Sequence, residues 1–167
     1  RQPFVHKLSV DEIRNRVSGR QWFHNFDFGQ GVTTNGRDPS YKKLAALRLP
    51  DLTGKSVIDV GSYDGFFAFE AERQGASRIV ANDDFVWRWP GSSASGNFDI
   101  VKDILSSQVE KLVMPVEELN SETAGTYDVS VTVFDGTVTS ASALATAVID
   151  DQPSGNPNDL YVSAIDF

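Results

Sequence analysis

The order of apolar and polar positions between residues 55 and 133 predicts strands that alternate with helices. Four short apolar runs have the length and composition of strands, at 56–60, 78–82, 109–114 and 127–133. Helical patterns separate the earlier runs, at 66–73 and 98–105. This alternation is typical of an α/β protein with a doubly wound, mostly parallel sheet, so the first two strands should be parallel neighbours.

The flanking segments have weaker patterns. Ser9 is followed three residues later by Glu12, a capping-box spacing that predicts a short helix over 8–17. Residues 21–36 are rich in aromatic side chains and glycine and predict an ordered loop. The remaining predicted elements are a helix at 38–47, a Gly- and Ser-rich loop at 87–96, a weak helix at 142–149 and a fifth strand at 160–165.

These elements divide the chain into two parts of one compact domain. Residues 1–50 form an N-terminal helical layer with the aromatic loop, and residues 51–167 form the core that carries the predicted sheet. The C-terminal part of that core is short and atypical, because Gly, Ser, Thr and Ala dominate after Phe134.

Composition narrows the range of functions. The chain of 167 residues has 23 acidic and 15 basic side chains, a net charge of −8, which disfavours DNA and other long nucleic acids as partners. The absence of cysteine excludes disulfides, thiolate metal sites and a cysteine nucleophile. No apolar run approaches the roughly 18 residues of a membrane span, and no signal-peptide pattern is present, so we expect a cytoplasmic setting without a membrane partner.

The turn after the first predicted strand is a candidate ligand site. Gly61 and Gly65 remove side chains where the backbone bends and where a ligand must approach, and the helix that follows offers unpaired N–H groups. A dinucleotide fingerprint needs a middle glycine, G-x-G-x-x-G, whereas this turn is G-x-x-x-G with carboxylates at Asp59 and Asp64. Two carboxylates repel phosphate and attract an ammonium, which disfavours a nucleotide-dependent oxidoreductase.

Acidic residues at the next strand ends extend this site. Asp83 ends the second strand at the spacing that one βαβ unit requires and can accept hydrogen bonds from two ribose hydroxyls, with Asp84 as the alternative. After the third strand, Val116 can pack on an adenine ring while Glu117 or Glu118 accepts its exocyclic amine. The implied ligand is an adenosine with a cationic, non-phosphorylated tail, and S-adenosylmethionine fits that description.

These motifs resemble the class I S-adenosylmethionine-dependent methyltransferases, and within them a group similar to the bacterial tRNA wobble-uridine methyltransferases. The resemblance covers about residues 21–129 and rests on segments at 22–24, 29–36, 59–67, 80–83, 114–119 and 125–129. It implies a Rossmann-like fold, S-adenosyl-L-methionine as cofactor and methyl transfer as the reaction. The predicted cofactor-binding residues are Asp59, Gly61, Tyr63, Gly65, Asp83, Asp84, Val116 and Glu117.

The segment after the fourth strand departs from that family. Such enzymes continue into a Gly-rich segment with Tyr and His that faces the methyl group, and residues 132–137 contain neither. A cofactor-binding protein without transfer activity is therefore the alternative to an enzyme. Tyr63 likewise has two interpretations, as a wall of the cofactor pocket or as a cover for the helix.

The aromatic segment 22–28 is the candidate acceptor site. His24 lies amid Trp22, Phe23 and Phe26 and is the best available general base, with an aromatic-flanked structural histidine as the alternative. We expect a small organic acceptor, because tRNA binding needs several phosphate contacts that an acidic protein with dispersed basic residues supplies poorly; a tRNA-modifying enzyme is the alternative. With two histidines and no clustered ligands, no metal is expected.

Overall fold

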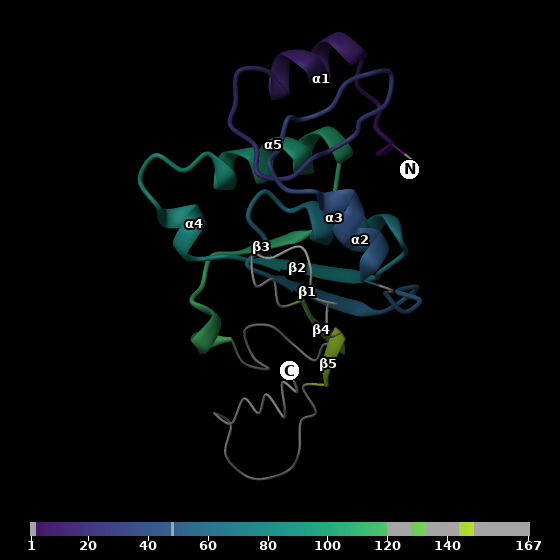
Figure 1. Cartoon of the computed structure of the whole chain (residues 1–167), viewed down its shortest axis with the longest axis vertical. Coiled ribbons are helices and arrows are strands. Elements are labelled where there is room, and N and C mark those ends of the chain that lie inside the picture. Colours follow the sequence, from purple (N-terminus) through teal and green to yellow (C-terminus); the bar gives the residue numbers. More distant parts are fainter. Residues whose placement is uncertain (1–2, 48, 120–127, 133–143, 149–167) are drawn as a thin grey trace.

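The computed structural model describes residues 3–47, 49–119, 128–132 and 144–148 (Figure 1). Its helices are α1 (Val10–Val17), α2 (Ser40–Ala46), α3 (Phe66–Arg73), α4 (Phe85–Arg88), α5 (Ala94–Leu105) and the 3-10 helix η1 (Val116–Glu118). Its strands are β1 (Ser56–Val60), β2 (Arg78–Asn82), β3 (Glu110–Leu112), β4 (Asp128–Thr132) and β5 (Leu144–Val148).

The first three strands form a parallel sheet in the order β1-β2-β3. Val60 is in register with Asn82, and Asn82 with Leu112, so the carboxyl ends of the three strands lie at one edge. This confirms the prediction of two parallel neighbours joined by the glycine turn and α3. In Figure 1 the helices α1, α2, α3 and α5 lie above this sheet.

The last two described strands depart from the predicted pattern. β4 approaches β1, but its hydrogen-bonded partner is β5, and the two are antiparallel. The helix predicted over 142–149 is therefore wrong. A helix of this length is marginal by itself, whereas Leu144, Thr146 and Val148 have the two-residue spacing that suits a strand with a partner. The fifth strand predicted at 160–165 lies outside the described residues.

The predicted N-terminal cap of α1 is confirmed. Ser9 Oγ accepts a hydrogen bond from the Glu12 backbone N–H, and Glu12 Oε2 accepts one from the Ser9 backbone N–H at 2.9 Å. The helix buries Ile13 and Val17 and packs against α5. Local capping therefore starts the helix, and burial of its apolar face holds it on the protein.

The prediction of a loop over 87–96 is wrong at both of its ends. Asp83 Oδ1 accepts a hydrogen bond from the Val86 N–H at 3.1 Å, which satisfies a backbone donor in the first turn of α4. α5 begins at Ala94, earlier than its apolar pattern indicated. Asn97 and Ser93 both donate to the Gln21 carbonyl oxygen, at 2.6 and 2.7 Å, so contacts with a distant loop fix this start.

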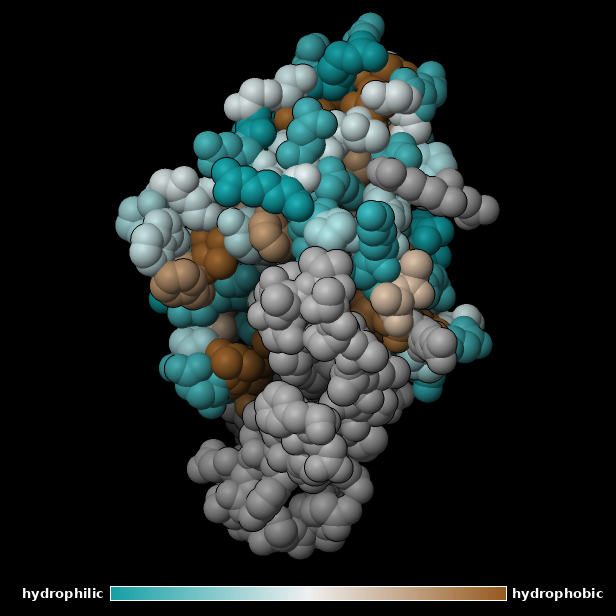
Figure 2. Space-filling view, in the orientation of Figure 1, coloured by the Kyte–Doolittle hydropathy of each residue, from teal (hydrophilic) through white to brown (hydrophobic). Residues whose placement is uncertain are grey.

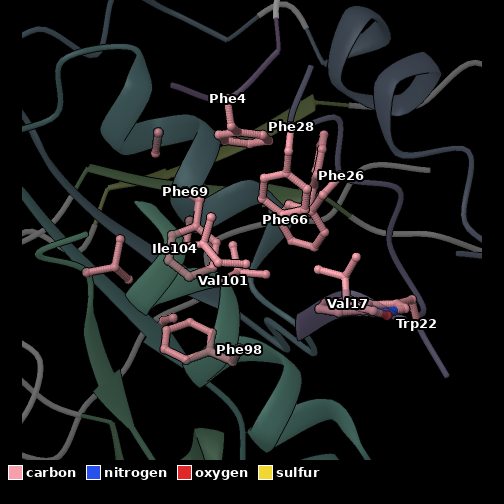
Figure 3. Packing of buried hydrophobic residues seen from close by; sticks show 14 of the residues in the cluster. Phe4, Val17, Trp22, Phe26, Phe28, Phe66, Phe69, Phe98, Val101 and Ile104 are labelled. Atoms are coloured by element: carbon pink, nitrogen blue, oxygen red, sulfur yellow. The ribbon is translucent and has the colours of Figure 1, made fainter. Parts of the chain in front are cut away.

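The aromatic loop and α3 share the largest cluster of buried rings (Figure 3). Phe26 and Phe66 are fully buried with ring centroids 5.5 Å apart, and Phe4 and Phe28 pack on Phe26. Burying each such side chain contributes about 1.5–3 kcal/mol. Phe66 and Phe69 of α3 are both buried in this core. In the part of the chain described here, no helix is long and apolar enough to cross a membrane.

Candidate functional site

The glycine turn between β1 and α3 is hydrogen-bonded to the end of β2 on one side and is open on the other. The backbone N–H groups of Gly61 and Ser62 both donate to the Asn82 carbonyl oxygen, at 2.8 and 3.0 Å. Gly61 has a φ of 73°, and a Cβ atom at this position would meet no protein atom within 4 Å. The space that a side chain would fill is therefore free for a ligand.

Gly65 serves a different purpose. Its φ is 90°, and a Cβ atom here would lie 2.6 Å from ring atoms of Phe69 and of Phe98. Gly65 therefore lets the turn pack against the core. Sequence reasoning placed it in the ligand site, and the geometry supplies a packing reason for the glycine.

Asp83 holds the turn with its carboxylate. Oδ2 accepts a hydrogen bond from the Tyr63 N–H at 3.0 Å, and Oδ1 accepts the Val86 N–H. Each carboxylate oxygen can accept a further bond, so the side chain retains acceptors for hydroxyl groups. Asp84 instead pairs with Arg88 one helical turn along α4, at 2.5 Å. Of the two neighbours, Asp83 is the one joined to the glycine turn.

Asp59 lies at the end of β1 beneath the same turn. Its Oδ2 atom accepts hydrogen bonds from Ser62 Oγ at 2.6 Å and from the Ala68 N–H at 3.2 Å. Burial raises the pKa of this carboxyl group, against the opposing effect of the Ser62 hydrogen bond, and the nearby charge of Asp83 raises it further. Asp59 is thus built into the turn and is harder to ionise than an exposed aspartate.

Asp64 joins the aromatic loop to the glycine turn. Its fully buried carboxylate accepts hydrogen bonds from the backbone N–H groups of Phe23, at 2.9 Å, and of His24, at 3.3 Å. The Nδ1 atom of His24 also pairs with it. A carboxylate with these partners is not the free charge near the ligand that the sequence indicated for Asp64.

His24 is enclosed by aromatic rings. The residue is 4% exposed, its ring stacks on Phe66 with centroids 5.7 Å apart, and Phe67 and Tyr63 meet it edge to face. These contacts are those of the structural alternative, in which the histidine holds the loop in place. Its role as a base stays a prediction.

Exposed apolar side chains follow the carboxyl ends of the parallel strands. In Figure 2, brown atoms gather at the left of the view, over α4 and over the segment after β3. The residues are Val60 after β1, Phe85 and Trp89 around α4, and Val113 and Val116 after β3. Glu117 is exposed beside Val116 on η1. An apolar edge of this kind offers a flat ring somewhere to pack.

A cavity of about 480 Å³ lies between the aromatic loop, the glycine turn and α4. The aromatic loop contributes Gln21, Trp22 and Phe23 to its walls, Arg37 directly follows this loop, and Tyr63 comes from the turn. The rest of the wall comes from α4 and the segment after it: Phe85, Val86, Trp89, Pro90, Gly91, Ser92 and Ser93. Its volume lies within the ordinary range for small-molecule sites.

The two tryptophans near α4 have different settings. Trp87 is buried, and its indole N–H donates to the Tyr63 carbonyl oxygen at 2.5 Å. Its ring packs on Phe98 and lies 5.1 Å below the Lys111 ammonium. Trp89 is 56% exposed and lines the cavity. Trp87 is therefore an anchor, and Trp89 is available to a ligand.

The structure thus gathers most of the predicted site at the carboxyl edge of the sheet. Asp59, Gly61, Tyr63 and Asp83 surround the turn, and Val116 with Glu117 follows β3. Sequence reasoning missed Arg37 and Phe85 as cavity residues, because neither belongs to a recognisable motif. Within the described residues, no group of three or more His, Asp or Glu side chains is placed to hold a metal.

Comparisons with known proteins add little to this geometry. No protein-family model matches the sequence, and no curated protein is similar to it. One solved structure with a related arrangement is a "putative RNA methyltransferase" from Pyrococcus horikoshii, 20% identical, with a TM-score of 0.39. The similarity covers 68% of this chain and 55% of that one. A likeness at this level carries no weight for function, which has to be argued from the site.

Proposed function

We propose that the protein binds S-adenosylmethionine at the carboxyl edge of its parallel sheet and transfers the methyl group to a small organic acceptor. The observation that carries this proposal is the open glycine turn beside Asp83: space at Gly61, and carboxylate acceptors next to it. A ribose presents two hydroxyl donors, which match those acceptors.

The charge of the turn favours a sulfonium ligand over a dinucleotide. Asp83 keeps a carboxylate beside the turn, and the turn lacks the middle glycine that lets a phosphate approach the backbone. An adenosine whose tail carries positive charge meets attraction at the same place.

The apolar strand ends supply a place for the adenine. Val116 is exposed after β3, so an adenine ring that packs on it would bury apolar surface. Glu117, beside Val116, can accept a hydrogen bond from the exocyclic amine.

In methyl transfer, the main task of the protein is to align the acceptor atom with the methyl group. S-adenosylmethionine, held at the open turn beside Asp83, would supply an electrophilic methyl group to a nucleophilic acceptor atom. The protein's part is to hold that atom in line with the carbon–sulfur bond and to limit access of water. We assign this part to the loop that Asp64 fixes over the turn. His24 supports that loop, and the acceptor's proton can leave to His24 or to solvent.

The pairing of basic side chains favours a small acceptor over tRNA. Arg14 pairs with Asp11, Arg16 with Asp103 and Lys43 with Asp38. These are some of the dispersed basic residues that phosphate contacts would need, and their internal partners reduce their attraction for a polyanion. The resemblance to the wobble-uridine methyltransferases therefore supports a shared cofactor more than it supports a shared RNA substrate.

Calorimetric titration tests cofactor binding. We expect S-adenosylhomocysteine to bind and NAD not to. Asp83→Ala should lower the affinity for S-adenosylhomocysteine by about tenfold or more, because a hydrogen bond to a charged group contributes about 1.5–3 kcal/mol. Asp84→Ala removes the neighbouring carboxylate, which pairs with Arg88, and should leave the affinity unchanged.

Two results would refute the cofactor assignment: equal affinities for Asp83→Ala and wild type, both folded by their melting curves, or preference for NAD. Turnover with an acceptor panel then separates an enzyme from a cofactor-binding protein without transfer activity. Methylated product supports the enzyme, and S-adenosylhomocysteine binding without product on any acceptor favours the binding protein.

A further inference from the structure

The cavity beside the glycine turn has a chemical character of its own. Tyr63 belongs to the turn and also lines this cavity, so the cavity adjoins the proposed cofactor site across one residue. Its remaining walls come from the aromatic loop and from α4 with the segment that follows it. The cavity is therefore placed to hold a second molecule next to the first.

The charge of the cavity is opposite to that of the turn. Among the described residues, Arg37 is the one charged side chain that lines it, and no acidic side chain pairs with this arginine. Several other described arginines do have carboxylate partners, as Arg73 has Glu70 and Arg78 has Glu110. A guanidinium without a partner offers a planar fork of N–H donors, which matches a carboxylate in a two-pronged contact.

The walls of the cavity are flat rings. Phe23 stacks on Tyr63 with ring centroids 4.4 Å apart and an interplanar angle of 29°. On the other side, Phe85 and Trp89 lie 4.9 Å apart, and both are more than half exposed. Exposed rings of this size are costly to leave in water unless something packs on them, and aromatic ligands do so with favourable ring-to-ring geometry.

We propose that this cavity binds the methyl acceptor and that the acceptor is an aromatic carboxylic acid. The role of the ligand as a methyl acceptor rests on the proposed function. The prediction that the ligand is an aromatic carboxylic acid depends only on the side chains that line the cavity. The rings take the planar body, and Arg37 takes the carboxylate. One guanidinium balances a single carboxylate charge, whereas a phosphate ester carries close to two. A volume of about 480 Å³ accommodates a one- or two-ring acid.

Titration with a matched pair of probes tests the proposal. Indole-3-acetate and indole-3-acetamide share their ring system and differ in charge. We expect the acetate to bind about tenfold more tightly than the amide, and Arg37→Gln to remove that preference while leaving the amide unaffected. Arg14→Gln makes the same change of charge on the far surface of α1 and should leave the preference intact. Trp89→Ala should weaken both probes.

The same titration in saturating S-adenosylhomocysteine distinguishes the two proposals. Unchanged acetate affinity supports a separate acceptor cavity, and competition between the two ligands overturns it. Equal binding of acetate and amide, or equal losses in Arg37→Gln and Arg14→Gln, also overturns the inference while S-adenosylhomocysteine binding stands. Failure of S-adenosylhomocysteine to bind refutes the proposed function, whereas the acetate preference still tests the chemistry of the cavity.

Discussion

Substitution of Gly65 and of Gly61 by alanine should affect different properties of the protein. We expect Gly65→Ala to lose mainly stability and Gly61→Ala to lose mainly ligand affinity. In Gly65→Ala the new Cβ lies 2.6 Å from ring atoms of Phe69 and of Phe98, and the φ of 90° adds backbone strain. Overpacking a core costs about 1–3 kcal/mol, and a left-handed residue with a side chain about 1–2 kcal/mol. The sum, about 2–5 kcal/mol, is a large share of the stability of a small domain.

Gly61→Ala is the matched control for that loss. Its φ of 73° carries similar strain, but a Cβ atom there meets no protein atom within 4 Å. We therefore expect only the backbone cost, about 1–2 kcal/mol, in the free energy of unfolding. Affinity for S-adenosylhomocysteine should fall sharply, because the methyl group enters the space assigned to the ligand.

For each variant, urea unfolding gives the free energy of unfolding and calorimetric titration gives the affinity for S-adenosylhomocysteine. The expected result is a larger loss of stability in Gly65→Ala and a larger loss of affinity in Gly61→Ala, measured where both proteins are folded. Stability losses of equal size would refute the packing argument for Gly65. Wild-type affinity in Gly61→Ala would refute the assignment of the open side of the turn to the ligand.

Two buried carboxylates lead to further predictions. Asp64→Ala leaves the Phe23 and His24 N–H groups without their acceptor and should lower the free energy of unfolding by about 3–5 kcal/mol in urea, which a loss below about 1 kcal/mol would contradict. Because burial raises the pKa of Asp59, its stabilising contribution is complete below about pH 3.9 and is lost as the pH rises through the folded value. The free energy of unfolding of Asp59→Asn, measured in urea, should therefore rise relative to that of wild type as the pH increases from about 4 to 7. A fall relative to wild type over this range would contradict the argument.

The parts of the fold that sequence predicted well are those that local interactions determine. The capping box at Ser9 starts α1 through contacts three residues apart, and β1, the glycine turn, α3 and β2 follow from periodicity and one turn motif. The carboxyl edge was predictable for the same reason, since parallel strands bring Asp59 and Asp83 to one side of the sheet.

The parts that sequence missed depend on distant contacts. α5 begins earlier than its apolar pattern because Asn97 and Ser93 bond to the Gln21 carbonyl group, and β5 forms where its pairing with β4 outweighs a weak helix propensity. The cavity residue Arg37 gave no local signal at all. It lines a cavity only because the aromatic loop folds back over the turn, which Asp64 secures.

Tyr63 shows how these distant contacts prepare the site. This residue has a φ of 54°, in the left-handed region that side chains other than glycine rarely adopt. Asp83 accepts its N–H, the Trp87 indole donates to its carbonyl oxygen, and Phe23 stacks on its ring. Contacts from three elements hold the residue in a conformation that costs energy by itself, and such strain is typical of ligand-binding positions. Because Tyr63 belongs to the turn and also lines the cavity, these contacts fix the residue that the two candidate sites share.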